Sequence, residues 1–245
     1  MRAIVLVDLD DTLFQTLRKC PPDVPQDALT ALGFGRDGGP LGFATPRQAA
    51  FLAWLGEAAL VVPVTGRSHD ALSRVRIPYK AAVCAHGGVI LDDGGAVDPG
   101  WAAEIAARAA PHKATLAALA EASQGTKVAA RILAEGGTDL YLLLKDPGGD
   151  ETLLDPVLDR ILPMVPADWT IHRNGNNAAL MPPFLGKAHA VRALLPRLRA
   201  LYPDAPVIGI GDSLSDAPFM ALCDYAMMPS GSQLGAAALE ALAPR

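Results

Sequence analysis

Acidic side chains cluster where the first apolar stretch of the chain ends. Asp8 and Asp10 follow the apolar run 3–7, and side chains two residues apart leave the same side of an extended chain. Ligands of open α/β sheets bind at the carboxyl ends of strands, where two carboxylates can act as a nucleophile and a proton carrier. The alternative is that both aspartates only make hydrogen bonds within a turn, which is how we interpret the neighbouring Asp11.

A second apolar stretch, PVIGIG, is followed in the same way by Asp212 and Asp216. Carboxylates that lie close together repel one another, so bringing this pair near Asp8 and Asp10 requires a cation. Mg²⁺ fits because it takes oxygen ligands and keeps several waters, and therefore needs few protein carboxylates. The Gly-Asp-x-x-x-Asp pattern alone is modest evidence, but the two pairs together predict a magnesium site.

Two further segments offer groups that bind anions. Thr65, Gly66 and Arg67 follow the apolar stretch LVVPV, and a hydroxyl beside a run of turn amides can hold phosphate oxygens. Lys187 opens a helical pattern, and an ammonium at a helix start is unfavourable for the helix dipole. We therefore interpret Lys187 as a partner for anions.

The segments that carry these residues alternate between strand-like and helix-like patterns. Apolar runs at 3–7, 60–65, 81–85, 206–211 and 225–228 alternate with helical patterns at 46–57, from 68, at 186–201, 215–222 and 232–242. This alternation is typical of a parallel α/β sheet. Residues 15–45, rich in proline and glycine, are the exception. We expect them to form a long loop, a feature that is uncommon in compact domains and often functional.

The middle of the chain follows a different order. Between residues 90 and 182 the patterns run α-β-β-α-β-β, which describes a small antiparallel sheet with helices on one face. The long helical pattern here, 101–123, is expected to break at Pro111. The sequence therefore predicts an α/β protein with a core domain at 1–86 and 184–245 and an inserted cap domain at 87–183.

Four motifs in the predicted core resemble those of a known family. In order and spacing, DLDDTL from Asp8, TGR from Thr65, Lys187, and GDSLSD from Gly211 resemble the four motifs of the haloacid dehalogenase superfamily. The insert resembles the type II cap of its sugar-phosphatase branch, and AALMPPFLGKAHAV is similar to the cap exit of sucrose-phosphate and trehalose-phosphate phosphatases. The resemblance implies a Rossmann-like parallel-sheet core with an inserted α+β cap.

The same resemblance implies a mechanism for the core residues. Asp8 would attack the phosphorus and form an aspartyl-phosphate. Asp10 would protonate the leaving alcohol and then activate the water that cleaves the intermediate. Thr65 and Lys187 would hold the transferring phosphoryl group. Because true dehalogenases lack the second acid, Asp10 indicates a phosphatase rather than a dehalogenase.

The resemblance also implies a Mg²⁺ ion held by Asp8, the backbone carbonyl of Asp10 and Asp212, with Asp216 binding or orienting nearby. The expected function is a Mg²⁺-dependent phosphomonoester hydrolase acting on a small phosphorylated metabolite, with a sugar phosphate as the favoured substrate class. Two alternatives stay open: a phosphosugar mutase of the phosphomannomutase type, which shares this core and cap, and a non-catalytic phosphometabolite-binding protein. The filled motif positions argue against the second.

Substrate specificity is expected to come from the cap. Arg131 lies on the polar face of the alternating pattern 127–135, and Asn174 lies at an asparagine-rich hairpin tip where amides could reach sugar hydroxyls. The alternative is a solvated sheet face and a plain turn. In the core, the family often has Asn-Gly after the third strand, where this chain has His86-Gly87. We interpret His86 as structural; the alternative is that it faces the leaving group.

Composition limits the compartment and the partners. The 245 residues are 51% apolar and 19% charged, which indicates a globular chain, and the net charge of −5 without a basic run argues against nucleic acid. The apolar stretch near the start is too short for a signal peptide or a membrane span. The three cysteines lack paired spacing. We therefore expect a cytoplasmic protein without disulfides or zinc, either a monomer or a homodimer.

Overall fold

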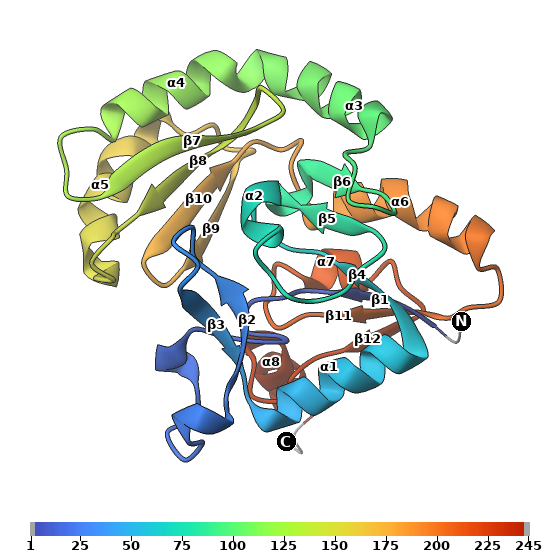
Figure 1. Cartoon of the computed structure of the whole chain (residues 1–245). Helices are drawn as coiled ribbons and strands as arrows, with labels where there is room; N and C mark the ends of the chain where they lie inside the picture. The colour runs from blue at the N-terminus through green and yellow to red at the C-terminus, as the bar shows by residue number, and fades with distance from the viewer. Residues whose placement is uncertain (1–2, 243–245) are drawn as a thin grey trace. The chain divides into compact units, whose positions relative to one another are not determined.

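The computed structural model describes residues 3–242 and divides the chain into two compact units. Unit 1 consists of Met1–Asp98 and Lys187–Arg245, and unit 2 consists of Pro99–Gly186. In the colours of Figure 1, unit 1 combines the blue and cyan first part of the chain with the orange and red last part. Its sheet can form only when these two distant parts meet.

A four-stranded parallel sheet lies at the centre of unit 1, in the order β12-β11-β1-β4. β1 (Ala3–Val7) lies between β4 (Ala59–Pro63) and β11 (Val207–Ile210), and β12 (Tyr225–Met227) forms one edge. Four of the five β1 side chains are buried, as expected for a central parallel strand covered on both faces. The parallel α/β core that the sequence predicted is confirmed.

The helices of unit 1 are α1 (Pro46–Ala58), α2 (His69–Leu72), α6 (Lys187–Leu201), α7 (Ala217–Met220) and α8 (Gln233–Leu242). α1 begins with a capping box, in which the Thr45 hydroxyl accepts from the Gln48 backbone at 3.3 Å and the Gln48 side chain accepts from the Thr45 backbone at 2.9 Å. α2 and α7 are single turns, shorter than the helical patterns from 68 and at 215–222.

Pro63 is tolerated because it is the last residue of β4. The backbone of Val64 donates to Val7 at 2.8 Å, so the ladder continues past the proline. Thr65 then donates to Val83 in β5 (Ala82–Cys84) at 2.9 Å. β5 pairs antiparallel with β6 (Val89–Leu91), so the loop after Thr65 lies beside the turn between those two strands.

Residues 15–45 are not the structureless loop that their composition suggested. They contain the hairpin β2 (Thr30–Phe34) and β3 (Pro40–Ala44), with short 3₁₀ turns at Leu17–Lys19 and Gln26–Ala28. The expectation was wrong because two glycines of the hairpin serve packing. A Cβ on Gly42 would lie 2.7 Å from the ring of the buried Phe14, and one on Gly33 would lie 3.4 Å from it.

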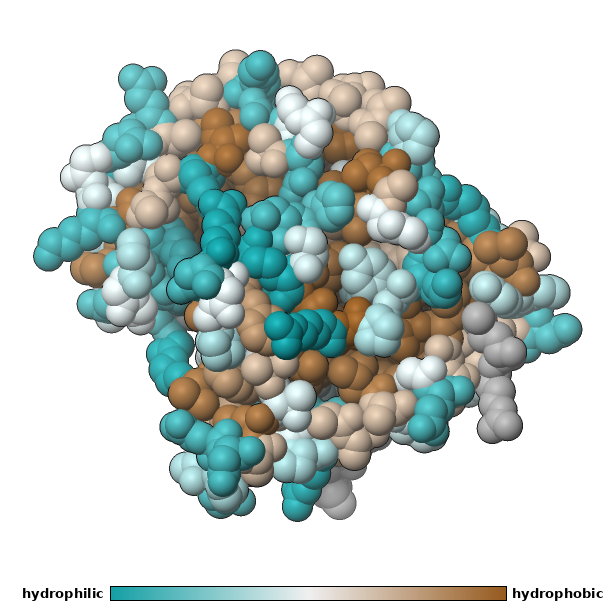
Figure 2. Space-filling model, in the orientation of Figure 1, coloured by the Kyte–Doolittle hydropathy of each residue, from teal (hydrophilic) through white to brown (hydrophobic). Residues whose placement is uncertain are grey.

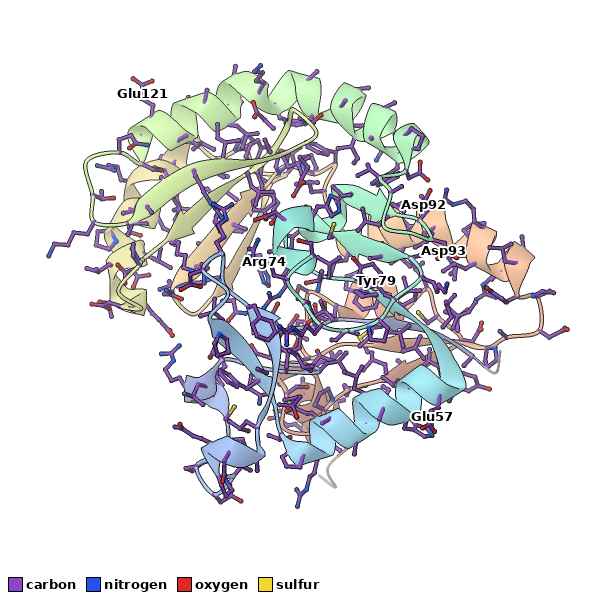
Figure 3. The ribbon with its side chains drawn as sticks, in the orientation of Figure 1. Glu57, Arg74, Tyr79, Asp92, Asp93 and Glu121 are labelled. Atoms are coloured by element: carbon purple, nitrogen blue, oxygen red, sulfur yellow. The ribbon has the colours of Figure 1, made fainter. Side chains whose placement is uncertain are left out.

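The segment after α2 anchors this hairpin. The backbone of Phe34 donates to Arg74 at 3.1 Å, and the backbone of Arg76 donates to Leu32 at 2.8 Å. The Arg74 guanidinium, labelled in Figure 3, donates to the Phe34 carbonyl at 3.2 Å and pairs with the Asp70 carboxylate at 2.7 Å. The hairpin is therefore fixed to unit 1 by both backbone and side-chain hydrogen bonds.

Unit 2 is an antiparallel sheet with helices packed on it. The strands β7 (Ala129–Glu135), β8 (Thr138–Lys145), β10 (Asn177–Met181) and β9 (Thr170–Asn174) pair in that order. The helices are α3 (Pro99–Ala109), α4 (Lys113–Ala122) and α5 (Leu154–Ile161), and Figure 1 shows α4 running along β7 and β8. α3 and α4 are separated by the short turn that contains Pro111, as predicted.

The core of unit 2 lies between this sheet and its helices. Leu116 and Leu119 of α4 and the apolar face of α5 pack against strand residues such as Leu142 and Leu144. The strand side chains Leu142 and Leu144 leave the same face of the sheet, so α4 and α5 both pack on that face. The predicted α+β arrangement of the insert is confirmed.

Among residues 3–242, no helix combines the length and apolar character that crossing a membrane would require. Hydrophilic and apolar side chains are mixed over the face of the molecule that Figure 2 shows.

Candidate active site

Three carboxylates meet at the carboxyl edge of the sheet in unit 1. β1 and β11 are parallel neighbours, so the residues that follow them, Asp8 and Asp212, emerge at the same edge. Oxygens of Asp8, Asp212 and Asp216 all lie within 4.8 Å of one another. Asp8 is 5% exposed and Asp216 is fully buried. Buried carboxylates this close need a counter-charge.

Lys187 supplies part of that counter-charge. Its ammonium, at the first residue of α6, donates to Asp8 Oδ1 at 2.6 Å and to Asp216 Oδ1 at 2.7 Å. The lysine side chain is only 10% exposed. Burial disfavours the ammonium, but the charges of Asp8 and Asp216 outweigh burial and raise the pKa of Lys187 above its ordinary value.

One lysine does not neutralise the cluster. Burial, helped by the charges of Asp216 and Asp10 and opposed by Lys187, raises the pKa of Asp8 to about 7. Burial and the charges of Asp216 and Asp11 raise the pKa of Asp212 to about 6. A divalent cation would remove this repulsion, and oxygen donors are what Mg²⁺ prefers. The donor set therefore fits Mg²⁺.

Asp10 lies beside the cluster but its side chain binds a different partner. Both carboxylate oxygens accept from Arg67, each at 2.7 Å. The Arg67 guanidinium also lies 5.1 Å from the centre of the Phe14 ring. A bidentate pair of this kind fixes the carboxylate in orientation as well as position. The sequence predicts a substrate-binding role for Arg67, and in the structure its guanidinium is bound to Asp10.

The turn after β5 holds the loop at 65–67 through backbone hydrogen bonds. Thr65 is 1% exposed, and its hydroxyl accepts from the Arg67 backbone at 3.1 Å. The backbone of Ala85 donates to the Arg67 carbonyl at 2.6 Å, and that of His86 donates to the Thr65 carbonyl at 3.2 Å. The positions of Thr65 and Gly66 are therefore set by contacts within unit 1.

The two cap residues that the sequence singled out lie in unit 2. Arg131 pairs across the sheet with Leu143, and Asn174 pairs with Asn177. The adjacent Leu142 belongs to the helix-covered core, so alternation puts Arg131 on the opposite face, where its side chain is exposed. The side chain of Asn176 donates to the Asp146 carbonyl at 2.6 Å and is a structural link of the hairpin.

Solved structures share this fold over nearly the whole chain. The sucrose-phosphatase of Synechocystis sp. PCC6803, solved with sucrose and phosphate, is 18% identical, with a TM-score of 0.56 over 99% of this chain and 97% of that one. The C-terminal domain of the C. albicans trehalose-6-phosphate phosphatase is 15% identical, with a TM-score of 0.56 over 89% of this chain and 72% of that one. The chain has the haloacid dehalogenase fold.

A protein of Thermoplasma acidophilum is also similar, at 16% identity and a TM-score of 0.52 over 98% of both chains. No family model matches the sequence, and no curated protein matches it. At such identities the likeness establishes the haloacid dehalogenase fold that the motifs predicted, and the activity has to be argued from the site.

Two hydroxyls, which the sequence did not single out, donate hydrogen bonds to the acidic cluster of this haloacid dehalogenase fold. The Thr12 hydroxyl lies 3.2 Å from Asp212 Oδ1 and 3.4 Å from Asp8 Oδ2 and can donate to one of them at a time. The Ser213 hydroxyl donates to Asp216 Oδ2 at 2.8 Å. Both residues belong to the quoted motifs DLDDTL and GDSLSD, so their place in those motifs was the available signal.

Asp216 differs from the other carboxylates in its hydrogen bonding. Its Oδ2 accepts from the backbones of Asp212 and Ser213, at 3.2 and 3.1 Å, as well as from the Ser213 hydroxyl. Burial opposes its ionised form, but Lys187 and these hydrogen bonds outweigh burial and hold the pKa of Asp216 below its usual value. Since both oxygens are occupied, Asp216 is suited to orient Lys187 and the Asp212 loop.

Proposed function

We propose that the protein is a Mg²⁺-dependent phosphomonoester hydrolase that acts on a small phosphorylated metabolite, a sugar phosphate. The observation that carries the proposal is the convergence of Asp8, Asp212 and Asp216, whose oxygens lie within 4.8 Å of one another, with Lys187 bound to Asp8 and Asp216. A second acid, Asp10, lies beside this cluster. The likeness to a sucrose-phosphatase and a trehalose-6-phosphate phosphatase supports the sugar-phosphate class.

In the proposed reaction the Asp8 carboxylate attacks the phosphorus, the bond to the leaving oxygen breaks, and Asp10 gives that oxygen a proton. Water then attacks the aspartyl-phosphate while Asp10 takes up its proton, which releases phosphate and restores Asp8. Lys187 and Thr65 bind the phosphoryl oxygens, with the backbone of Gly66 beside them.

Asp8, the Asp10 carbonyl and Asp212 would hold the Mg²⁺ ion. When bound, it neutralises negative charge on the carboxylates and on the phosphoryl group. Both carboxyls must be ionised to serve as ligands, whereas their raised pKa values show that burial disfavours the ionised forms. A bound cation would favour the ionised forms and so offset this effect.

Arg67 acts in this scheme as a positioning residue for Asp10. Its two hydrogen bonds hold the Asp10 carboxylate at one orientation. Asp10 must carry a proton to act as the acid, so one of these hydrogen bonds has to loosen when substrate binds.

Unit 2 is proposed to be the cap, with Arg131 and Asn174 on the substrate side, and unit 1 the catalytic core. Cys20, Cys84 and Cys223 form no disulfide in the structure, and a cytoplasmic location is part of the proposal.

Phosphate release by the purified protein tests the proposed function. The substrates are p-nitrophenyl phosphate and a panel of sugar phosphates, phosphoglycerates and nucleotides, each with Mg²⁺ or with a chelator. We expect release only with Mg²⁺, and we expect Asp8→Asn to abolish it while the circular dichroism spectrum is unchanged. Isomerisation of a hexose phosphate without free phosphate would instead indicate a mutase, and near-normal release by Asp8→Asn would refute the mechanism.

A further inference from the structure

The loop that carries Asp212 is bound by the start of the C-terminal helix, α8. The backbone of Leu234 donates to the Asp212 carbonyl at 2.8 Å, and the backbone of Leu214 donates to Gln233 Oε1 at 3.0 Å. The second of these contacts spans 19 residues of sequence within unit 1. Two hydrogen bonds, one on either side of Ser213, therefore fix the backbone of this loop from the helix.

The first turn of α8 is itself held by the chain that precedes it. The Ser232 hydroxyl donates to the Pro229 carbonyl at 2.6 Å and accepts from the Gly235 backbone at 3.0 Å, which caps the helix. A Cβ on Gly235 would lie 2.2 Å from the Pro229 carbonyl oxygen and 2.9 Å from that of Ser230. Because both neighbours are backbone atoms, no side-chain movement would relieve this contact. Glycine at position 235 therefore lets the start of the helix lie close against 229–230.

The rest of α8 is sparsely packed. Among residues 233–241, Gly235 is the only buried one, and Leu239 is 56% exposed. Helices in proteins are normally stabilised by the burial of an apolar face. The first turn, with its hydrogen bonds and its close packing, is therefore the main attachment of α8 to unit 1.

This turn also borders the solvent-accessible side of Asp212. A cleft of about 260 Å³ is lined by Asp212, Pro229 and Ser232 on one side and by Asp11 and Lys19 on the other. The attachment of α8 therefore lies beside the proposed metal ligand and not at a remote part of its loop.

We propose that Gln233 and Gly235 are positioning residues for Asp212. The inference rests on the proposed function and deepens it. Mg²⁺ requires near-ideal octahedral geometry, so a carboxylate ligand on a loop has to be held in place by groups behind it. Gln233 holds the loop directly, and Gly235 lets the turn that carries Gln233 approach closely enough to do so. The C-terminal helix is thereby part of the metal site without supplying a ligand.

The first arm of the test measures the Kd for Mg²⁺ by titration calorimetry at pH 8. We expect Gln233→Ala to raise this Kd about fivefold, because the Leu214 backbone loses its acceptor and the loop gains freedom. Gln233→Glu keeps an accepting oxygen and should bind Mg²⁺ as tightly as the wild type or more tightly. Glu240→Ala, in the exposed last turn of α8, is the control and should leave the Kd unchanged.

The second arm separates positioning from general stabilisation. Gly235→Ala pushes the first turn away from Pro229, and we expect it to raise the Kd for Mg²⁺ about tenfold. In Gln233→Ala, Tm with a chelator present should stay within about 3 °C of the wild type, because the lost hydrogen bond is exposed. Saturating Mg²⁺ should restore kcat of Gln233→Ala to that of the wild type, since the variant weakens metal binding and leaves the reacting groups intact.

The two hypotheses fail in distinguishable ways. A wild-type Kd for Mg²⁺ in Gln233→Ala or in Gly235→Ala would overturn the role of that residue, while Mg²⁺-dependent phosphate release by the wild type still supports the phosphatase. A Gln233→Glu variant that binds Mg²⁺ as weakly as Gln233→Ala would also overturn the role of Gln233. A wild type that binds no Mg²⁺, or releases no phosphate from any substrate, would overturn the proposed function and both positioning roles with it.

Discussion

At the scale of residues, Lys187 is the group on which the acidic cluster depends. Its ammonium donates to Asp8 and Asp216, and the three side chains are 10% exposed or less. Removing one partner of a buried ion pair leaves an uncompensated charge, at a cost of about 3–5 kcal/mol. We therefore expect Lys187→Met to lower the free energy of unfolding by that amount in urea titrations at pH 7.5, and to abolish phosphate release.

Lys80 provides the matched control. Its pair with Asp93 is exposed on both sides, at 66% and 73%, and pairs of this kind contribute roughly 0–1 kcal/mol. Lys80→Met should leave both stability and activity nearly unchanged. If the two lysine variants were equally stable, the Lys187 pairs would not hold the cluster together.

At the scale of elements, the β2–β3 hairpin supports the turn that carries the catalytic acids. A methyl group on Gly42 would meet the Phe14 ring at 2.7 Å, and the Phe14 carbonyl accepts from the Asp11 backbone at 2.8 Å. We expect Gly42→Ala to lower the free energy of unfolding by about 1–3 kcal/mol, as overpacking does, and to reduce kcat because the turn shifts.

Gly56 is the matched control for this substitution. It lies within α1, and a Cβ there would meet nothing within 4 Å. Gly56→Ala should raise stability by about 0.5–1 kcal/mol, because alanine favours the helix, and leave kcat unchanged. If both substitutions changed stability in the same direction, the Phe14 contact would not be the reason for glycine at position 42.

The face of the unit 2 sheet that carries Arg131 gives a second prediction at this scale. Arg131 of β7 projects from it, whereas Arg173 of β9, at the other edge of the sheet, binds Asp155 and the Glu151 carbonyl on the helix-covered side. Arg131→Ala should raise KM for the preferred sugar phosphate severalfold, with stability unchanged. Arg173→Ala should leave KM unchanged. An unaltered KM in Arg131→Ala would make this face a plain solvated surface.

At the scale of the whole molecule, the acidic cluster links stability to pH. Carboxyls with raised pKa values keep protons that the unfolded chain has already released. Burial of Asp8 and Asp212 raises these values to about 7 and about 6, from 3.8 for both. The contribution of these two groups to the stability of the metal-free protein therefore falls as pH rises from about 4 to 7.

Mg²⁺ should reverse this trend, because it binds the ionised carboxylates. We expect the rise in Tm caused by Mg²⁺ to be largest at pH 8 and to shrink as pH falls through 7 and 6, with an apparent affinity about twentyfold weaker at pH 6 than at pH 8. Asp212→Asn should abolish the response. A Tm shift that was independent of pH, or that persisted in this variant, would place the metal elsewhere.

Outside residues 15–45, the sequence by itself determined the order of strands and helices, and it identified the carboxylates that follow β1 and β11. Buried parallel strands have continuous apolar runs, and their parallel pairing brings Asp8 and Asp212 to one edge. Local patterns are sufficient for both inferences. The motif spacings likewise sufficed to predict the haloacid dehalogenase fold.

Tertiary structure alone decided which groups are partners. Arg67 binds Asp10 across a sequence separation of 57 residues. The glycines of the β2–β3 hairpin make room for Phe14, although the composition of that segment resembles a loop. The turn at His86 and the loop at 65–67 bind each other through their backbones. Such contacts depend on how distant segments pack, and neither periodicity nor composition encodes that packing.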